Sequence, residues 1–510
     1  MIFSSYNFLL FYLPATWLGF VLLRFLCRAL LLGRPAGVSV TQVEHHAIET
    51  SAGQPQVEIT LGEARRASFA NACLLLWLLL ASLWFYADWR LDHLWLLLGF
   101  VAVNFGVVRL LTRKRSVWLL IAIILANVGL LAFFKYIPLF TAEESRSLLL
   151  AGLPLGISFY VFQAVAFQID HWRGKAVARS PLEFALFLSF FPQLIAGPIV
   201  HGRELLPQLR RIVRRNLHLS LGLTMLALGL AKKVLIADSL AGGVDSIYAG
   251  DYAVDVLVTA AAGVGYGAQL YFDFSGYADM AVGLGLLFGI KLPQNFRRPY
   301  TASSVTVFWR RWHITLSRFL RDYLYISLGG NRRGNLRRSF NLLATMGLGG
   351  LWHGAGWQFL FWGLGHGFLL TLESVLRRRF PMAVNAIPRP VAVGLTLIAV
   401  MLLWIPFRAE SLSDAWLLLS GLVILPALTF PELSQWLQPL VMAAAVSTPP
   451  AVVLLWSFGC ILVAGLRPTA WRWALSANPF KRGVVTALLL LLVLKTLADR
   501  PAAPFLYFQF

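Results

Sequence analysis

The sequence predicts an all-α membrane protein whose chain crosses the bilayer many times. Of its 510 residues, 58% are hydrophobic and 13% are charged, and the mean hydropathy is +0.70. A soluble domain rarely has so few charges, and long apolar runs recur along the chain. We expect roughly 11–13 transmembrane or re-entrant helices. They should form one membrane domain over residues 1–510, with no soluble domain.

The apolar runs give the expected positions of these helices. A full span needs about 20 residues, so the shorter runs are expected to be re-entrant or to lie at the interface. The runs comprise residues 8–26, 69–86, 95–111, 117–134, 148–169, 184–200, 217–230, 254–272, 280–290, 342–359, 360–376, 391–406, 415–425, 451–464 and 484–494.

The first run is expected to be a permanent span and not a cleavable signal peptide. No basic residue precedes residues 8–26, and no small-residue cleavage site follows them. Arg24, Arg28 and Arg34 lie at the end of this run. Because loops rich in Lys and Arg stay in the cytosol, the first helix is expected to run from outside to inside.

The net charge of +21 does not indicate nucleic-acid binding, because the basic residues lie in loops between apolar runs. They gather in residues 109–115, 173–179, 203–215, 291–338 and 377–379. Residues 291–338 contain eleven Lys or Arg and one acid, Asp322. Membrane topology and attraction to anionic headgroups explain most of this distribution. A second interpretation, which remains open, is a docking surface for the phosphates of a cytosolic coenzyme.

The adjacent histidines His45 and His46 and the three cysteines are best interpreted as having ordinary structural roles. Residues 36–68 are polar and are expected to form a cytosolic loop, with a short strand at residues 57–61. His45 and His46 in this loop have no spacing that supports a zinc site, so no metal is expected. The cysteines lie in or beside apolar runs and are expected to be buried small hydrophobes. They are Cys27, Cys73 and Cys460.

Three apolar segments contain residues that interrupt helices. These are residues 153–160 (LPLGISFY), 191–198 (FPQLIAGP) and 271–280 (YFDFSGYADM). Irregular backbone at bilayer depth is tolerated where protein or a cavity surrounds it. Asp273 and Asp279 are therefore expected to face the interior and to be paired. The candidate partners are Arg310, Arg311 and Arg321. A buried polar network that only fixes helix packing is the alternative interpretation.

Residues 308–354 contain two histidines in different settings. Residues 303–330 have apolar positions at three- and four-residue spacing with arginines between them, which predicts a helix in the cytosolic interface. His313 lies on this helix, near the inner face. His353 lies deep in an apolar run, among glycines, and His366 lies in the next run. An ionisable residue in a span indicates a functional site, although a neutral histidine bonded to a neighbouring carbonyl is the simpler interpretation.

The chain resembles the membrane-bound O-acyltransferases, and among them the bacterial alginate O-acetyltransferase branch. The matching segments run in order over residues 1–34 and about 120–408: MIFSSYNFLLFYLP, FFKY, LPLGISFYVFQ, FFPQLIAGPI, QLYFDFSGYADMAVGLGLLFGIKLPQNFRRPY, FWRRWHITLSRFLRDYLYISLGGNRRG and GLGGLWHGAGWQFLFWGLGHG. Residues 36–68 are longer than the family's usual first loop, and no motif is recognised beyond about residue 410.

This resemblance implies helices around a tunnel through the bacterial inner membrane, with the site at its narrow middle. It implies that His353 is catalytic and that His313 occupies the family's second polar position. It also implies a cytosolic acyl thioester, such as acetyl-coenzyme A, as a donor substrate, with no permanently bound cofactor. The residues expected to bind the donor are Arg310, Arg311, Arg321 and Trp312.

Relatives of this branch deliver acetyl groups to secreted polysaccharides, which suggests the partners. We expect periplasmic acetyltransferase proteins, a polysaccharide synthase or secretion complex, and membrane lipids. Alginate is the leading acceptor; cellulose, another exopolysaccharide and peptidoglycan remain open, and D-alanyl transfer to teichoic acid fits less well. A transporter or scaffold subunit of a secretion complex is the alternative, although the sequence lacks the paired halves of many transporters.

The chemistry expected at the site is general-base catalysis. A neutral His353 in a low-dielectric tunnel would take the proton of an acceptor hydroxyl. His313 would orient the donor or stabilise the developing oxyanion. No Ser-His-Asp triad can be recognised, and Asp322 is too far from His313 along a helix to be assigned by spacing.

Overall fold

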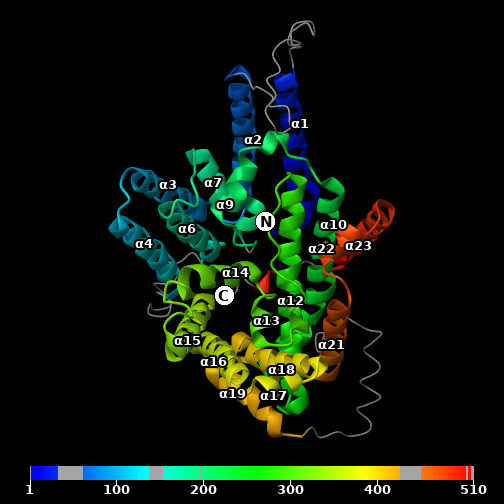
Figure 1. Cartoon of the computed structure of the whole chain (residues 1–510). Helices are drawn as coiled ribbons and strands as arrows, with labels where there is room; N and C mark the ends of the chain where they lie inside the picture. Colours follow the sequence, from blue (N-terminus) through cyan, green and yellow to red (C-terminus); the bar gives the residue numbers. More distant parts are fainter. Residues whose placement is uncertain are drawn as a thin grey trace, which may run out of the picture.

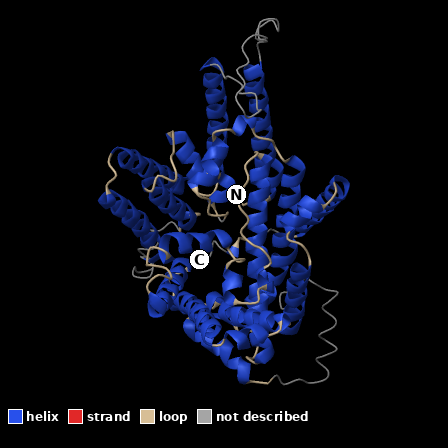
Figure 2. Ribbon diagram, in the orientation of Figure 1, coloured by secondary structure: helices blue, strands red, loops and turns tan. Residues whose placement is uncertain are grey.

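The computed structural model describes residues 2–32, 61–136, 153–195, 197–425, 449–500 and 503–506. Helices and connecting loops account for all of these residues, and no β-strand occurs among them (Figure 2). The expected all-α fold is confirmed.

Long helices alternate with short or irregular ones along the chain. The first half contains η1 (Asn7–Tyr12), α1 (Leu13–Leu32), α2 (Leu61–Ala87), α3 (Leu91–Arg113), α4 (Val117–Tyr136), α6 (Ile157–Trp172), α7 (Pro181–Ser189), α8 (Phe191–Leu194), α9 (Gly202–Leu209), η3 (Ile212–Arg214), α10 (Leu219–Leu230), η4 (Ala231–Ala237), α11 (Asp238–Ala249) and α12 (Val256–Leu287). The second half contains η5 (Pro299–Thr301), α13 (Val305–Trp309), α14 (Ile314–Phe319), η6 (Leu320–Tyr325), α15 (Gly334–His353), α16 (Trp357–Arg379), α17 (Pro381–Ala386), α18 (Arg389–Arg408), α19 (Leu412–Ser420), η7 (Gly421–Val423), α21 (Pro450–Leu466), α22 (Ala470–Ser476) and α23 (Pro479–Asp499).

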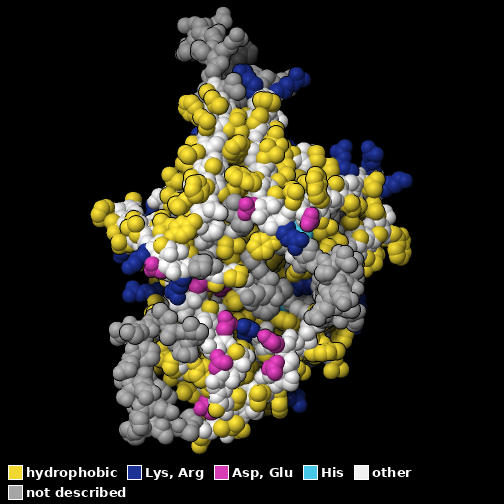
Figure 3. Space-filling model, turned by 180° about the vertical axis from the view of Figure 1, so that it is seen from behind, with side chains coloured by type: hydrophobic (Ala, Val, Ile, Leu, Met, Phe, Trp, Pro, Cys, Tyr) yellow, Lys and Arg dark blue, Asp and Glu magenta, His cyan; other side chains and the backbone are white. Residues whose placement is uncertain are grey.

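Seven helices in the described part of the chain are long and apolar enough to cross a membrane. They are Asn7–Ala29, Arg65–Ala87, Leu91–Arg113, Val117–Tyr136, Leu219–Ala249, Trp357–Arg379 and Arg389–Arg408, and the bent pair α21 and α22 would make an eighth. Their outer faces carry exposed side chains such as Phe11 and Trp118, and apolar side chains cover much of the face in Figure 3. Such surfaces suit a lipid environment.

Some of the apolar runs in the described part of the chain form short helices instead of full spans. The run at residues 184–200 contains α7 and α8, which are separated by a break at Phe190. Residues 61–68, expected in a polar loop, instead form the first turns of α2. His45, His46 and most of the expected strand at residues 57–61 lie outside the described residues.

Helix α12 forms the centre of the fold and packs against α10, α11, α18 and α21 (Figure 1). Gly229 of α10 and Gly276 of α12 face each other where these helices cross. A Cβ atom at residue 229 would lie 2.5 Å from the carbonyl oxygen of Gly276, and one at residue 276 would lie 2.7 Å from that of Gly229. The close approach of the two backbones therefore requires glycine at both positions.

Both ends of the described chain reach α12. The ring of Phe3 stacks on Tyr277 with centroids 4.8 Å apart, and Phe505 packs edge-on against the same ring at 4.3 Å. The backbone N–H of Leu506 donates to Asp273 at 3.2 Å. The last described residues, which carry no recognised motif, therefore complete the interior around α12.

The aspartates of α12 are buried and paired, but their partners are lysines of η4. Lys233 Nζ lies 2.6 Å from Asp273 and 2.8 Å from Asp238, and Lys232 Nζ lies 2.5 Å from Asp279. The predicted partners were wrong: Arg310, Arg311 and Arg321. The ion pairs connect α12 with η4 and α11, which agrees with a network that fixes helix packing.

The basic segment at residues 303–330 is not one interfacial helix. It folds into α13, α14 and η6, and His313, between α13 and α14, has a left-handed backbone with φ of 39°. Phe308, Trp312 and Phe319 are buried in the core. The predicted interfacial helix is therefore wrong, because these apolar side chains pack in the protein core.

Candidate active site

His353 lines a small cavity at the C-terminal end of α15. The cavity has a volume of about 60 Å³. Its wall comes from the α2–α3 turn, the end of α4, the start of α6 and the end of α15. The lining residues are Trp89, Lys135, residues 153–159, Ile195, Trp352 and His353. Although the His353 side chain is buried, it lines this space and can meet a small substrate group there.

Close packing of α15 against α16 fixes the position of His353. A Cβ atom at Gly350 would overlap the carbonyl oxygen of Phe359, and one at Gly363 would overlap that of Met346. Gly350 and Gly363 thus allow the close contact between α15 and α16.

Three aromatic rings surround the imidazole of His353. The ring centroids of Trp352, Trp362 and Phe407 lie 4.6, 5.1 and 5.1 Å from that of His353. His366 lies on the other side of Trp362 and accepts a hydrogen bond from Trp309 Nε1 at 3.3 Å. His366 is therefore part of the aromatic packing and does not line the cavity.

The hydrogen bonds of Asn295 determine the tautomer of His313. Asn295 Oδ1 accepts from the backbone N–H of Thr315 at 3.2 Å and from its hydroxyl at 3.0 Å. Because a backbone N–H can only donate, this side-chain atom is an oxygen. His313 Nδ1, 3.1 Å from the same oxygen, must therefore carry a proton. In the neutral ring, Nε2 then carries the lone pair and can only accept.

The structure brings His313 and His353 into one region of the interior. The ring of Phe159 lies 6.4 Å from that of His313 and 6.1 Å from that of Trp352, which contacts His353. The two imidazoles are also close enough to interact electrostatically. His313 is fully buried, so its predicted place on an interfacial helix was wrong.

The residues expected to bind the donor lie in different environments. Arg310 and Arg321 are exposed, but Asp322 forms an ion pair with Arg321 at 2.7 Å and raises its pKa. Arg311 donates to the carbonyl and hydroxyl oxygens of Thr301 at 3.3 and 3.0 Å. Trp312 packs against Trp404 in the core, with centroids 5.0 Å apart. Of the four, Arg310 has the most accessible side chain that remains available for a phosphate.

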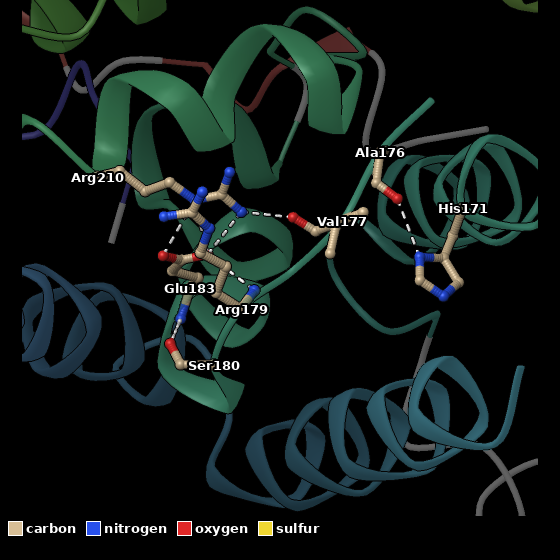
Figure 4. Close-up of polar contacts among 7 residues, drawn as sticks. All are labelled: His171, Ala176, Val177, Arg179, Ser180, Glu183 and Arg210. Carbon is tan, nitrogen blue, oxygen red and sulfur yellow. Dashed lines mark hydrogen bonds and ion pairs between the residues drawn. The ribbon is translucent and has the colours of Figure 1, made fainter. Parts of the chain in front are cut away.

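A polar cluster between α7 and α9 uses other basic residues for internal contacts (Figure 4). The guanidinium of Arg210 binds both carboxylate oxygens of Glu183 at 3.1–3.2 Å and also donates to the carbonyl of Val177. The backbone N–H of Arg179 donates to Glu183 at 3.1 Å, and Ser180 Oγ caps α7. Part of the basic loop charge therefore stabilises the fold.

A second buried cluster lies between α6, α9 and η6. His201 Nδ1 lies 2.9 Å from the hydroxyl of Tyr323 and 3.7 Å from Asp170 Oδ2. Burial raises the pKa of Asp170, but its bonds with His201 and Tyr323 lower this pKa more, so it falls below its usual value. Arg318 binds Glu204 nearby through two hydrogen bonds, at 2.7 and 3.1 Å. These side chains contact one another, and their contacts indicate a structural role.

Lys135 was not singled out by the sequence, although it lies at the centre of the site. It directly follows the apolar run at residues 117–134, in the FFKY segment, and a lysine at the end of such a run is itself a signal of function. In the structure it lines the cavity together with His353. Among the described residues, no cluster of His, Cys, Asp or Glu could hold a metal ion.

The fold and the site define a class of protein with known members. The sequence profile of the membrane-bound O-acyltransferase family matches residues 73–407. The chain therefore belongs to this family, and it is a multi-pass membrane O-acyltransferase.

Individual relatives indicate the type of acyl group. The chain is 39% identical over 402 residues to a peptidoglycan O-acetyltransferase of Helicobacter pylori, which covers 71% of this chain and 76% of that protein. It is 38% identical over 417 residues to the probable alginate O-acetylase AlgI of Azotobacter vinelandii, covering 76% and 79%. It is 41% identical over 365 residues to the protein of the same name in Pseudomonas aeruginosa. That match covers 66% of this chain and 68% of the relative. The chain is thus a membrane O-acetyltransferase.

Proposed function

We propose that the protein moves an acetyl group from a cytosolic acyl thioester, such as acetyl-coenzyme A, across the bacterial inner membrane. The acetyl group then O-acetylates a secreted polysaccharide with the help of a periplasmic acetyltransferase. The observation that carries the proposal is the buried His353 in a cavity between helix ends. Two relatives are named for alginate and one for peptidoglycan. An alginate-like exopolysaccharide is therefore the leading acceptor, with cellulose and peptidoglycan next.

The course of the first helices supports an opening of the cavity toward the acceptor side. Helix α2 begins near Arg65 and ends before Trp89, and α3 then returns to Arg113. Helix α4 runs back again and ends at Lys135 and Tyr136. Most of the basic residues lie at the start of α2 near Arg65 and at the turn between α3 and α4 near Arg113. These ends of the helices therefore belong in the cytosol. Trp89 and Lys135 line the cavity at the opposite ends, where a periplasmic acceptor would arrive.

The two histidines have separate tasks in the proposed transfer. His353 takes the proton of the acceptor hydroxyl as its oxygen attacks the thioester carbonyl. The new carbon–oxygen bond forms, the carbon–sulfur bond breaks, and the proton passes from His353 to the leaving thiolate. Because Nε2 of neutral His313 is an acceptor, His313 can orient a hydroxyl or thiol group. It cannot donate to an oxyanion in this state.

The donor is proposed to approach from the basic cytosolic face. Its phosphates would meet Arg310, which is exposed, while the acetyl thioester would reach inward past the buried Trp312 and His313. An exposed arginine binds phosphate with two parallel hydrogen bonds and adds a salt-dependent attraction.

The test compares two buried histidines in the strain that secretes the polymer. His353→Gln should lower the acetyl content of the polymer at least about 100-fold, as expected when a general base is lost. His171→Gln is the matched control, because His171 is buried but lies outside the cavity lining, with its ring 2.9 Å from the carbonyl of Ala176 (Figure 4) and 3.1 Å from the hydroxyl of Thr112. The amounts of polymer and of membrane protein are measured alongside.

The same experiment separates the enzyme from the alternative functions. Loss of acetyl groups with normal polymer yield supports the transferase. Loss of the polymer itself in the His353→Gln strain would instead favour a transporter or a scaffold of the secretion complex. Normal acetylation in that strain would show that His353 is dispensable and would refute the proposal.

A further inference from the structure

We infer that Lys135 is a further catalytic residue of this site. Its ammonium group holds the end of α15 that carries His353, and it donates a hydrogen bond to the carbonyl oxygen that becomes negative during acetyl transfer. This inference rests on the proposed function and assigns a role that neither histidine can fill.

The end of α4 is attached to the end of α15 through three consecutive carbonyl groups. The last four carbonyls of an α-helix have no partner within the helix. Tyr136 donates its hydroxyl proton to the carbonyl of Leu351 at 2.6 Å. Lys135 Nζ donates to the carbonyl of Trp352 and, at 3.0 Å, to that of His353. A cation at this end of a helix is also favoured by the helix dipole.

Within the described part of the chain, no acidic side chain neutralises the positive charge of Lys135. Among the described residues, no carboxylate lies within 4.0 Å of Lys135 Nζ, whereas Lys232 and Lys233 each have acidic partners. The ammonium group lies 5.6 Å from the ring centroid of Trp352. A partly buried cation held only by carbonyls and a ring is costly to maintain, and this cost would be offset when negative charge develops beside it.

The ammonium group retains one N–H for the cavity. Lys has three donors, and the two carbonyls at the end of α15 engage two of them. Lys135 and His353 line the same cavity of about 60 Å³, so a reacting carbonyl near His353 is also near Lys135. Two alternative donors are unsuitable, because the neutral His313 accepts at Nε2 and His353 must take a proton. Of these three side chains, only Lys135 can donate to the oxyanion, and it is the one that carries a positive charge.

The reaction step balances with Lys135 in this role. As the acceptor oxygen bonds to the thioester carbon, the carbonyl π electrons move to its oxygen, and the Lys135 N–H stabilises that charge. The charge returns to re-form the carbonyl as the carbon–sulfur bond breaks. Lys135 keeps its proton throughout, while the proton of the acceptor hydroxyl travels through His353 to the thiolate.

The first test measures maximal rates in inside-out membrane vesicles from the polymer-secreting strain. Radiolabelled acetyl-coenzyme A is supplied at the cytosolic face, and label in polymer and membrane protein is counted. Lys135→Met should lower the maximal rate about 100-fold, the typical effect of removing an oxyanion donor. The donor KM should change little. Tyr136→Phe removes the neighbouring hydrogen bond to the carbonyl of Leu351 without removing a charge. This variant should keep most of the rate.

The second test restores the charge chemically. In a variant with Cys27, Cys73 and Cys460 replaced by alanine, Lys135→Cys should be inactive. Alkylation with 2-bromoethylamine creates a lysine-like side chain and should restore at least a tenth of the rate. Alkylation with iodoacetamide adds a neutral group of similar size and should not. Recovery with the neutral group, or a normal maximal rate in Lys135→Met, would overturn the inference.

The outcomes distinguish this inference from the proposed function. A rate that depends on His353 but not on Lys135 would leave the transferase intact and remove only the role of Lys135. If wild-type vesicles incorporate no label from acetyl-coenzyme A, the proposed donor fails. The Lys135 variants would then be compared by the acetyl content of polymer from intact cells, where the same rank order is expected.

Discussion

Replacing Asn295 with leucine should disable His313 while retaining the branched shape and the number of heavy atoms of the side chain. The amide oxygen of Asn295 accepts three hydrogen bonds, from His313 Nδ1 and from the backbone and hydroxyl of Thr315, at 3.0–3.2 Å. Leucine accepts none of them. Each buried donor left without a partner costs about 1–3 kcal/mol, and the His313 ring loses the bond that fixes its tautomer and orientation.

The expected result is a loss of acetyl transfer of about 100-fold, the order of effect that follows when a reacting group is misplaced by about 1 Å. Transfer is measured as label incorporated from acetyl-coenzyme A in inside-out vesicles, and stability as the thermal transition of the purified protein in detergent. Asn295→Asp is the matched control, because a carboxylate oxygen accepts the same bonds, so this variant should retain more activity than the leucine variant. A wild-type rate in Asn295→Leu would refute the tautomer assigned to His313.

Two further predictions concern packing that supports the site. Lys233→Met should destabilise the protein by about 3–5 kcal/mol, because it leaves the buried carboxylate of Asp273 without its cation. Adding Asp273→Asn should recover part of this loss in the thermal transition, and a double variant as unstable as the single one would contradict the assignment. Gly363→Ala should cost about 1–3 kcal/mol and reduce transfer, because its Cβ would overlap the carbonyl of Met346. Gly394→Ala, where a Cβ meets open space, should leave both the stability and the rate of acetyl transfer unchanged.

Local sequence explains why most helices could be predicted. Apolar runs such as residues 95–111 and 391–406 lie within α3 and α18, because a chain in lipid must satisfy its backbone hydrogen bonds within each segment. In the segment predicted to interrupt a helix, residues 191–198, the short helix α8 ends at Leu194. The family resemblance was confirmed as well, since its motifs are read directly from residue order.

The basic segment shows where a periodic pattern is ambiguous. Aromatic residues at helical spacing with arginines between them suit a helix on a membrane surface, but they equally suit short helices with one face against a core. Helix α13 ends at Trp309, and His313, with its left-handed backbone, is the N-cap of α14. No local signal indicated this turn, because histidine rarely adopts that conformation without tertiary contacts.

The sequence by itself determined the all-α membrane fold, the family and the two histidines that stand out. Only the tertiary structure decided what surrounds them: Asn295 beside His313, Lys135 beside His353, and lysines instead of arginines beside the aspartates of α12. Lys135 and His353 are 218 residues apart. Helix formation depends on neighbours three and four residues apart, whereas such a pair depends on how whole helices pack.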